Sequence, residues 1–138
     1  MIGYLDFLFF SYSGRIGRMP YWLGTLVIAV IQYFVGMWLI NLAMPGVMEL
    51  AADNAEVTLE VFQEIMLRTV VPVGIMSLVF MWPTYAIYTK RWHDRGKSGW
   101  WSLILFVPII GALWMFIECG FLSGTEGSNT YGPDPAYA

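Results

Sequence analysis

The residues best suited to chemistry lie close together, between residues 90 and 101, in the stretch KRWHDRGKSGWW. His93 and Asp94 are the residue types of a general base and of the acid that orients it. Adjacent residues on a turn rarely point at each other, and no serine or cysteine nucleophile is evident beside them. We therefore expect no catalytic residue, and a lipid-modifying enzyme built on this pair is the weakest functional hypothesis. One histidine and one cysteine without ligand spacing also predict no metal site.

The same stretch is rich in basic and aromatic side chains. It holds four of the seven lysines and arginines and three of the seven tryptophans. Near an anionic leaflet each basic residue contributes on the order of 1 kcal/mol to binding, and tryptophan favours the headgroup layer. Two arginines before the first apolar run can join them. The candidate residues for binding anionic headgroups or a partner protein are Arg15, Arg18, Arg91, His93, Asp94, Arg95, Lys97, Trp100 and Trp101.

A structural role is the alternative for this stretch. Basic residues beside a span act as a topology signal, and tryptophans anchor at the membrane interface. In that case Asp94 caps the next helix or pairs with Arg91 or Arg95. Gly96 and Gly99 would then permit a tight reversal of the chain.

The elements that position these side chains are long apolar runs. The chain has 138 residues, a length typical of one domain. It is 58% hydrophobic and only 12% charged, whereas about a quarter of the residues in soluble domains are charged. Three runs, at about residues 21–44, 69–89 and 100–122, are long enough to cross a bilayer. Because the backbone in hydrocarbon must satisfy its own hydrogen bonds, the sequence predicts an all-α integral membrane protein with three transmembrane helices.

Three polar segments complete this prediction: an acidic loop at residues 45–68, a basic loop at residues 90–99 and a polar tail at residues 123–138. In the acidic loop, Thr58 can cap a helix whose apolar residues recur at helical spacing. We expect a short amphipathic helix there, either in the interface or stacked directly on the second span. The turn-forming residues of the tail predict a rigid turn, with Tyr131 packed against the bundle.

The distribution of charge predicts an orientation. Six of the seven basic residues precede the first run or lie at residues 90–99. Basic loops stay cytoplasmic, so we expect the N-terminus to be cytoplasmic and, with three spans, the acidic loop and the tail to lie outside. One alternative changes the second half of this topology. Pro108 and Gly111 interrupt the third run, and residues 107–111 could be the tip of a re-entrant hairpin that returns the tail to the cytoplasm.

Apart from serine and threonine hydroxyls, three candidate polar side chains lie within the runs, namely Glu118, Gln32 and Asn41. Ionisable groups inside spans are candidates for function. Glu118 lies near the end of its run, where it can reach headgroup water. If it instead faced Gln32 or Asn41 inside the bundle, the group would form a proton or cation site.

Three separated segments resemble one known family. They are residues 13–22 (SGRIGRMPYW), residues 91–101 with their continuation at residues 107–111 (VPIIG), and residues 124–135 (GTEGSNTYGPDP). They are similar to the small bacterial inner-membrane proteins grouped as domain of unknown function 805. Pro20 stands where that family usually has an acid, and Ser123 where it usually has a proline. The resemblance implies a multi-pass inner-membrane protein and supplies no reaction.

The sequence therefore favours a non-enzymatic inner-membrane protein that binds lipid headgroups or partner proteins through its basic, aromatic loop. The alternative is a component of a small oligomeric channel or transporter. The expected partners are membrane lipids and either further copies of the chain or another membrane protein. No cofactor and no nucleic acid are expected.

Overall fold

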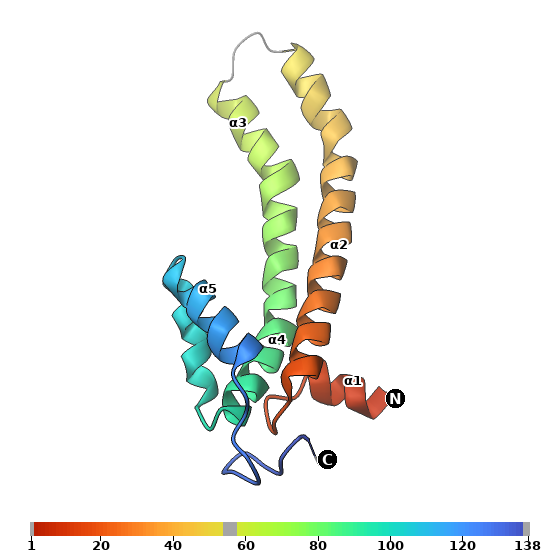
Figure 1. The fold of residues 1–138 in the computed structure, drawn as a ribbon. Coiled ribbons are helices and arrows are strands. Elements are labelled where there is room, and N and C mark those ends of the chain that lie inside the picture. Colours follow the sequence, from red (N-terminus) through yellow and green to blue (C-terminus); the bar gives the residue numbers. More distant parts are fainter. Residues whose placement is uncertain (1, 54–57, 137–138) are drawn as a thin grey trace. The chain divides into compact units, whose positions relative to one another are not determined.

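The computed structural model describes residues 2–53 and 58–136, and within those residues it is helical without a strand (Figure 1). Its elements are α1 (Ile2–Phe9), α2 (Arg18–Asp53), α3 (Leu59–Ile65), the π-helical turn η1 (Met66–Val70), α4 (Val71–Asp94), the 3-10 helix η2 (Gly99–Phe106), α5 (Ile110–Met115) and the π-helical turn η3 (Phe116–Phe121). The chain forms two compact units. We call Met1–Ile28 with Trp82–Ala138 the polar unit and Ala29–Met81 the apolar unit.

Two helical segments are long and apolar enough to cross a membrane. The first is α2, which contains the predicted run at residues 21–44 and continues through Pro45 to Asp53. The second is Leu59–Asp94, which contains the predicted run at residues 69–89. Large apolar side chains on both, such as Phe34 and Leu78, are exposed. Large exposed apolar surfaces usually mark contact with an apolar partner, and lipid can cover the whole length of such a helix.

The short helix predicted in the acidic loop is present as α3. Thr58 does cap a helix, because its Oγ1 accepts a hydrogen bond from the Val61 N–H at 3.3 Å. That helix continues through η1 into α4, so the stacked arrangement is the one found. The wider turn η1 ends two residues before Pro72, whose ring and missing N–H would otherwise disturb a regular helix. Most of the loop predicted at residues 45–68 is therefore helical, in α2, α3 and η1. Glu56 lies outside the described residues.

A single third span at residues 100–122 is also wrong. The chain instead forms a helical hairpin, in which η2 leads to a tight turn and α5 with η3 runs back (Figure 1). The Ile110 N–H bonds to the Pro108 carbonyl at 2.7 Å, and Ile109 between them has a φ of 64°. Gly111 permits the reversal, because a Cβ there would collide with the carbonyl oxygen of Ile104. The hairpin considered as an alternative is therefore the arrangement observed.

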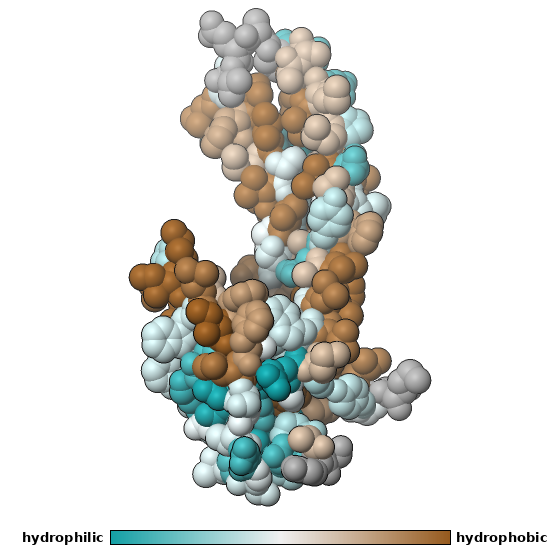
Figure 2. Space-filling view, viewed as in Figure 1, coloured by the Kyte–Doolittle hydropathy of each residue, from teal (hydrophilic) through white to brown (hydrophobic). Residues whose placement is uncertain are grey.

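The polar unit has a small core that fixes its helices. Ile16, Ile87, Trp92 and Met115 are buried there, and they come from three parts of the chain: the segment before α2, α4 and α5. Gly24 of α2 lies against the Ile87 side chain, and a Cβ at this position would be only 2.7 Å from Ile87 Cδ1. In this unit, hydrophilic side chains gather around the tail while hydrophobic ones cover the hairpin (Figure 2).

Candidate functional site

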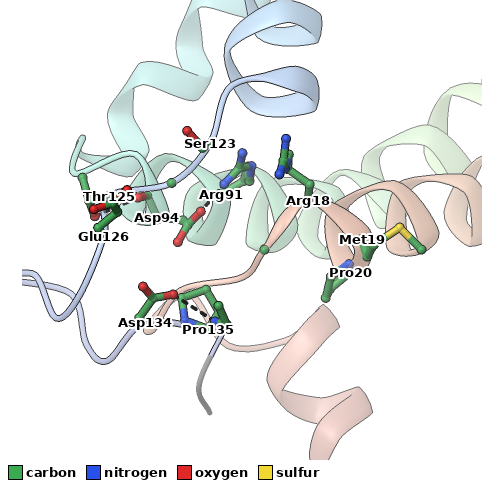
Figure 3. Close-up of a pocket in the computed structure, with 13 residues that line it drawn as sticks. Arg18, Met19, Pro20, Arg91, Asp94, Ser123, Thr125, Glu126, Asp134 and Pro135 are labelled. Carbon is green, nitrogen blue, oxygen red and sulfur yellow. Dashed lines mark hydrogen bonds and ion pairs between the residues drawn. The ribbon is translucent and has the colours of Figure 1, made fainter.

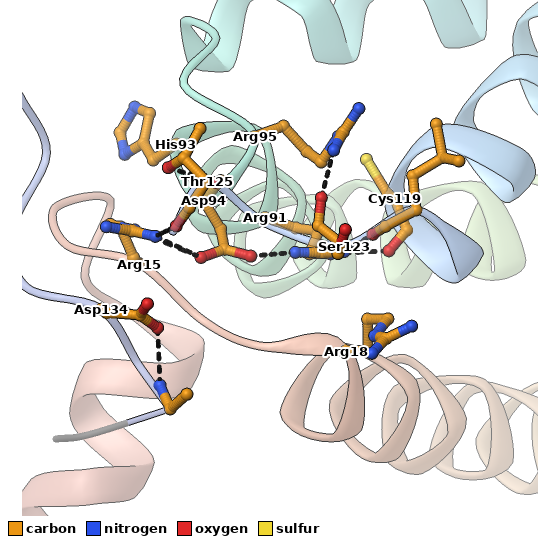
Figure 4. A network of polar contacts seen from close by, with 12 residues as sticks. Arg15, Arg18, Arg91, His93, Asp94, Arg95, Cys119, Ser123, Thr125 and Asp134 are labelled. Carbon is orange, nitrogen blue, oxygen red and sulfur yellow. Dashed lines mark hydrogen bonds and ion pairs between the residues drawn. The ribbon is translucent and has the colours of Figure 1, made fainter. Parts of the chain in front are cut away.

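A buried ion cluster around Asp94 is the centre of the polar unit (Figure 4). Arg15 contacts one carboxylate oxygen, with Nη2 at 3.0 Å and Nε at 3.2 Å from Oδ1. Arg91, one helical turn before Asp94, donates from Nη1 to Oδ2. The side chains of Arg15, Asp94 and Arg91 are 1%, 3% and 0% exposed. Two guanidinium groups therefore share one carboxylate, and the cluster keeps one excess positive charge.

Arg15 also fastens the tail to this cluster. Its guanidinium donates to the carbonyl oxygens of Thr125 at 2.6 Å, Gly127 at 2.7 Å and Gly132 at 3.2 Å. The Thr125 N–H in turn donates to the carbonyl oxygen of Asp94 at 2.8 Å. The tail thus packs on the segment that follows α4, in one compact unit. The expectation that residues 90–99 and the tail lie on opposite sides of the membrane depended on a single third span, and residues 100–122 do not form one continuous helix.

Three arginines and one tryptophan cap the end of the hairpin. The last carbonyl groups of a helix lack intrahelical partners, and positive charge is favourable beside them. Five consecutive carbonyl oxygens, at residues 119–123, each accept a hydrogen bond from a side chain elsewhere in the unit. The pairs are Arg91 with Cys119 and Leu122, Trp22 with Gly120, Arg18 with Phe121, and Arg95 with Ser123. Most of the predicted anion-binding arginines are therefore engaged within the chain.

Glu118 lies beside this cap and has two cationic partners. Its Oε1 accepts from Arg95 Nη2 at 3.2 Å and from Lys97 Nζ. Gln32 and Asn41 belong to the apolar unit, where the Asn41 amide donates to the Met37 carbonyl at 2.8 Å. The structure therefore places Glu118 in an ion pair beside the segment that follows α4, within the polar unit.

The two consecutive tryptophans differ in their surroundings. Lys97 Nζ lies 5.4 Å from the ring centroids of both Trp92 and Trp101, whereas Trp100 is 78% exposed. The cap of η2 is Ser98, whose Oγ accepts from the Trp100 N–H at 3.4 Å. The alternative role of Asp94 as that cap is corrected, while its predicted pairing with Arg91 is confirmed.

His93 has a structural environment of its own. Its Nδ1 lies 3.1 Å from the carbonyl oxygen of Gly14, and its ring stacks on Tyr131 at a centroid distance of 3.9 Å. The Asp94 carboxylate is occupied by Arg15 and Arg91, so the two neighbours do not form an acid–base pair. The packing predicted for Tyr131 is confirmed. Within residues 2–53 and 58–136, no group of three histidine, cysteine or acidic side chains could hold a metal ion.

Lys90 is a structural residue that the sequence did not single out. It is completely buried, and its Nζ donates to the carbonyl oxygens of Phe7 at 2.7 Å, Leu8 at 2.8 Å and Ser11. These acceptors are the free carbonyls where α1 ends. No residue-type signal could reveal this contact, because every acceptor is a backbone atom about eighty residues away in sequence.

A pocket of about 390 Å³ opens beside the ion cluster (Figure 3). The start of α2, the end of α4 and the tail all line it. Arg18 and Arg91 lie on one side, with Asp94 between them and the tail, and Glu126 and Asp134 come from the tail. Arg18 is exposed while Arg91 is buried, so Arg18 supplies the accessible cation.

Comparisons with known proteins agree on one family. The family model described as "Protein of unknown function (DUF805)" matches residues 9–133. "Inner membrane protein YhaI" of Escherichia coli (strain K12) is 31% identical over 135 residues, which cover 92% of this chain and 87% of that protein. "Inner membrane protein YhaH" of the same strain is 31% identical over 125 residues, covering 91% and 87%. "Uncharacterized protein YiiR" of that strain is 27% identical over 149 residues, covering 91% and 86%. No solved structure gives a significant match.

Proposed function

Because the chain belongs to the DUF805 family of proteins of unknown function, we propose that it is a multi-pass inner-membrane protein that binds phospholipid headgroups without catalysing a reaction. Three observations support this proposal. Two relatives are named inner membrane proteins, two helices are long and apolar enough to span a bilayer, and the pocket beside Asp94 presents an accessible arginine.

The proposed topology has two crossings and one re-entrant hairpin. In it, α2 and the helix Leu59–Asp94 cross the membrane, and the hairpin enters and leaves through the same leaflet. The N-terminus, the basic loop and the tail then share one side. Six of the seven basic residues lie in these parts, so that side is the cytoplasm.

The pocket suits a headgroup because of its charge and because Arg18 lies close to the start of the apolar run. The Arg15–Asp94–Arg91 cluster beneath it has one excess positive charge, and the tail adds two acids, Glu126 and Asp134, to the lining of the pocket. Arg18 begins α2 only three residues before the apolar run at Tyr21, which is roughly 4.5 Å of helix rise. A cation at this depth lies at the level of lipid phosphates, and the exposed Met19 beside it offers a contact for the acyl chain.

Arg18 carries this proposal. It donates one hydrogen bond, from Nη1 to the Phe121 carbonyl at 3.2 Å, and a guanidinium has five N–H donors. Arg18 is exposed and lines the pocket, so its remaining N–H groups are accessible to a ligand. Arg15 and Arg91, by contrast, are buried; Arg15 holds the tail and Arg91 holds the end of the hairpin, so their loss would destabilise the polar unit rather than report on a ligand.

Native mass spectrometry of the full-length protein in detergent tests this function. We expect Arg18→Gln to retain about fivefold less phospholipid than the unaltered protein, the effect of removing about 1 kcal/mol of attraction by one basic residue. Arg68→Gln is the matched control, because Arg68 lies in the apolar unit and already pairs with Glu64 at 2.7 Å. Equal lipid retention by the two variants would refute headgroup binding in this pocket.

A further inference from the structure

The pocket beside Asp94 has walls of opposite charge (Figure 3). Arg18 at the start of α2 is its accessible cation. Glu126 and Asp134, both from the tail, also line it, and neither has an arginine or lysine as an ion-pair partner within residues 2–53 and 58–136. A site that served only an anion would not gain from two unneutralised carboxylates beside its arginine, because like charges repel.

The two carboxylates can accept further hydrogen bonds. Asp134 accepts the Gly127 N–H at 3.0 Å on Oδ2 and the Ala136 N–H at 2.9 Å on Oδ1. Each carboxylate oxygen has two lone pairs, so one remains on each. The hydrogen bond from Ala136, followed by that from Gly127, holds the pKa of the Asp134 carboxyl below its ordinary value, so it is ionised at neutral pH. Glu126 is exposed.

We propose that this pocket selects phospholipids whose headgroup joins a primary ammonium to the phosphate, the phosphatidylethanolamine class. This inference rests on the proposed function and specifies its ligand. Arg18 would hold the phosphate, while Glu126 and Asp134 would accept hydrogen bonds from the ammonium. An ammonium group has three N–H donors. The quaternary ammonium of phosphatidylcholine has the charge without those donors, and the headgroup of phosphatidylglycerol has neither.

The test uses the full-length protein in detergent and short-chain phosphatidylethanolamine, phosphatidylcholine and phosphatidylglycerol, with binding measured by native mass spectrometry. We expect phosphatidylethanolamine to bind about three- to fivefold more tightly than either of the others, a difference typical of a partly exposed ion pair. Soluble phosphoethanolamine is a separate arm. It should compete only at much higher concentration, because it lacks the acyl chains that would contact Met19.

Variants of the two acids give the sharper result. Glu126→Gln should weaken binding of phosphatidylethanolamine and strengthen binding of phosphatidylglycerol, because one carboxylate no longer attracts the ammonium or repels the anion. Asp134→Asn should act in the same direction, and the thermal midpoint of unfolding would show whether the tail remains folded. Glu60→Gln is the control, since Glu60 is an exposed acid of α3 in the apolar unit.

The outcomes separate the two proposals. If phosphatidylglycerol binds as tightly as phosphatidylethanolamine, or if the preference survives both acid variants, the selectivity is refuted while headgroup binding stands. If soluble phosphoethanolamine competes as well as the lipid, the ligand is a free metabolite and both proposals are wrong. If none of the three lipids is retained and Arg18→Gln changes nothing, both again fail.

Discussion

At the scale of residues, Asp94 is the decisive side chain. It is nearly fully buried with two arginines on its carboxylate, and its backbone carbonyl also accepts from the tail. Burial of charge is tolerated only when the partners and hydrogen bonds replace the lost hydration. Here the guanidinium groups also bond five backbone carbonyls of the hairpin end and the tail. The carboxylate therefore organises two arginines that hold these segments in place.

Removing that carboxylate should have a large effect on stability. We expect Asp94→Asn to lower the free energy of unfolding by about 3–5 kcal/mol, because it leaves Arg15 and Arg91 buried with uncompensated charge. Glu64→Gln breaks an exposed ion pair, whose side chains are 39% and 45% exposed, and should cost at most about 1 kcal/mol. Chemical unfolding in detergent, followed by circular dichroism, measures both. Similar losses for the two variants would contradict a central role of Asp94.

At the scale of elements, the hairpin of η2, α5 and η3 is distinctive because the chain reverses its direction inside the single apolar run predicted at residues 100–122. Backbone donors at its tip have internal acceptors, with Val107 N bonded to Ile104 O at 2.9 Å and Gly111 N to Val107 O at 2.9 Å. Ile109 is 76% exposed at the tip. A turn that satisfies most of its donors and has apolar side chains can enter hydrocarbon with little loss of hydrogen bonding.

Gly111 is the position on which this hairpin depends. We expect Gly111→Ala to destabilise the protein by about 1–3 kcal/mol, because the new Cβ would meet the backbone of η2, which cannot move aside as a flexible side chain can. Gly74→Ala provides a control of opposite sign. It lies in α4 with nothing within 4 Å of an added Cβ, and alanine favours a helix by about 1 kcal/mol over glycine. Thermal unfolding in detergent distinguishes them, and equal stability of the two variants would contradict the close contact.

At the scale of the whole molecule, the basic segments and the tail gather in one unit, the polar unit. Residues from before α2, from the end of α4 and from the tail meet around Asp94. The rival function, a channel that uses Glu118, gains little from this arrangement. Its carboxylate is already paired with Arg95 and Lys97.

The proposed topology makes a prediction about membrane sidedness. In intact cells, a membrane-impermeant maleimide should label Gln63→Cys in α3, while Ser128→Cys in the tail should become reactive only after the membrane is opened. Both are made in a Cys119→Ser background, which removes the single native cysteine. Protection of the tail follows from two crossings and a returning hairpin. Labelling of Ser128→Cys from outside would mean that the third run crosses the membrane after all.

The sequence by itself determined the properties that depend on composition and local spacing. Apolar runs of sufficient length predicted the two long helices, a threonine before a helical pattern predicted the cap at Thr58, and the tail sequence suggested the packing of Tyr131. The family, too, was evident from short motifs. These signals act between residues close in the chain, or through burial of whole segments.

Only the tertiary structure decided what the basic residues do. A buried arginine and an exposed arginine have the same letter in the sequence, and the acceptors of Arg15, Arg91 and Lys90 are mostly backbone carbonyls that no residue type encodes. The hairpin likewise required knowledge of a contact, since a proline within an apolar run is compatible with both a kinked span and a reversal. The packing of Gly111 on η2 selected the reversal. That choice placed the tail, its two acids and Arg18 around one pocket.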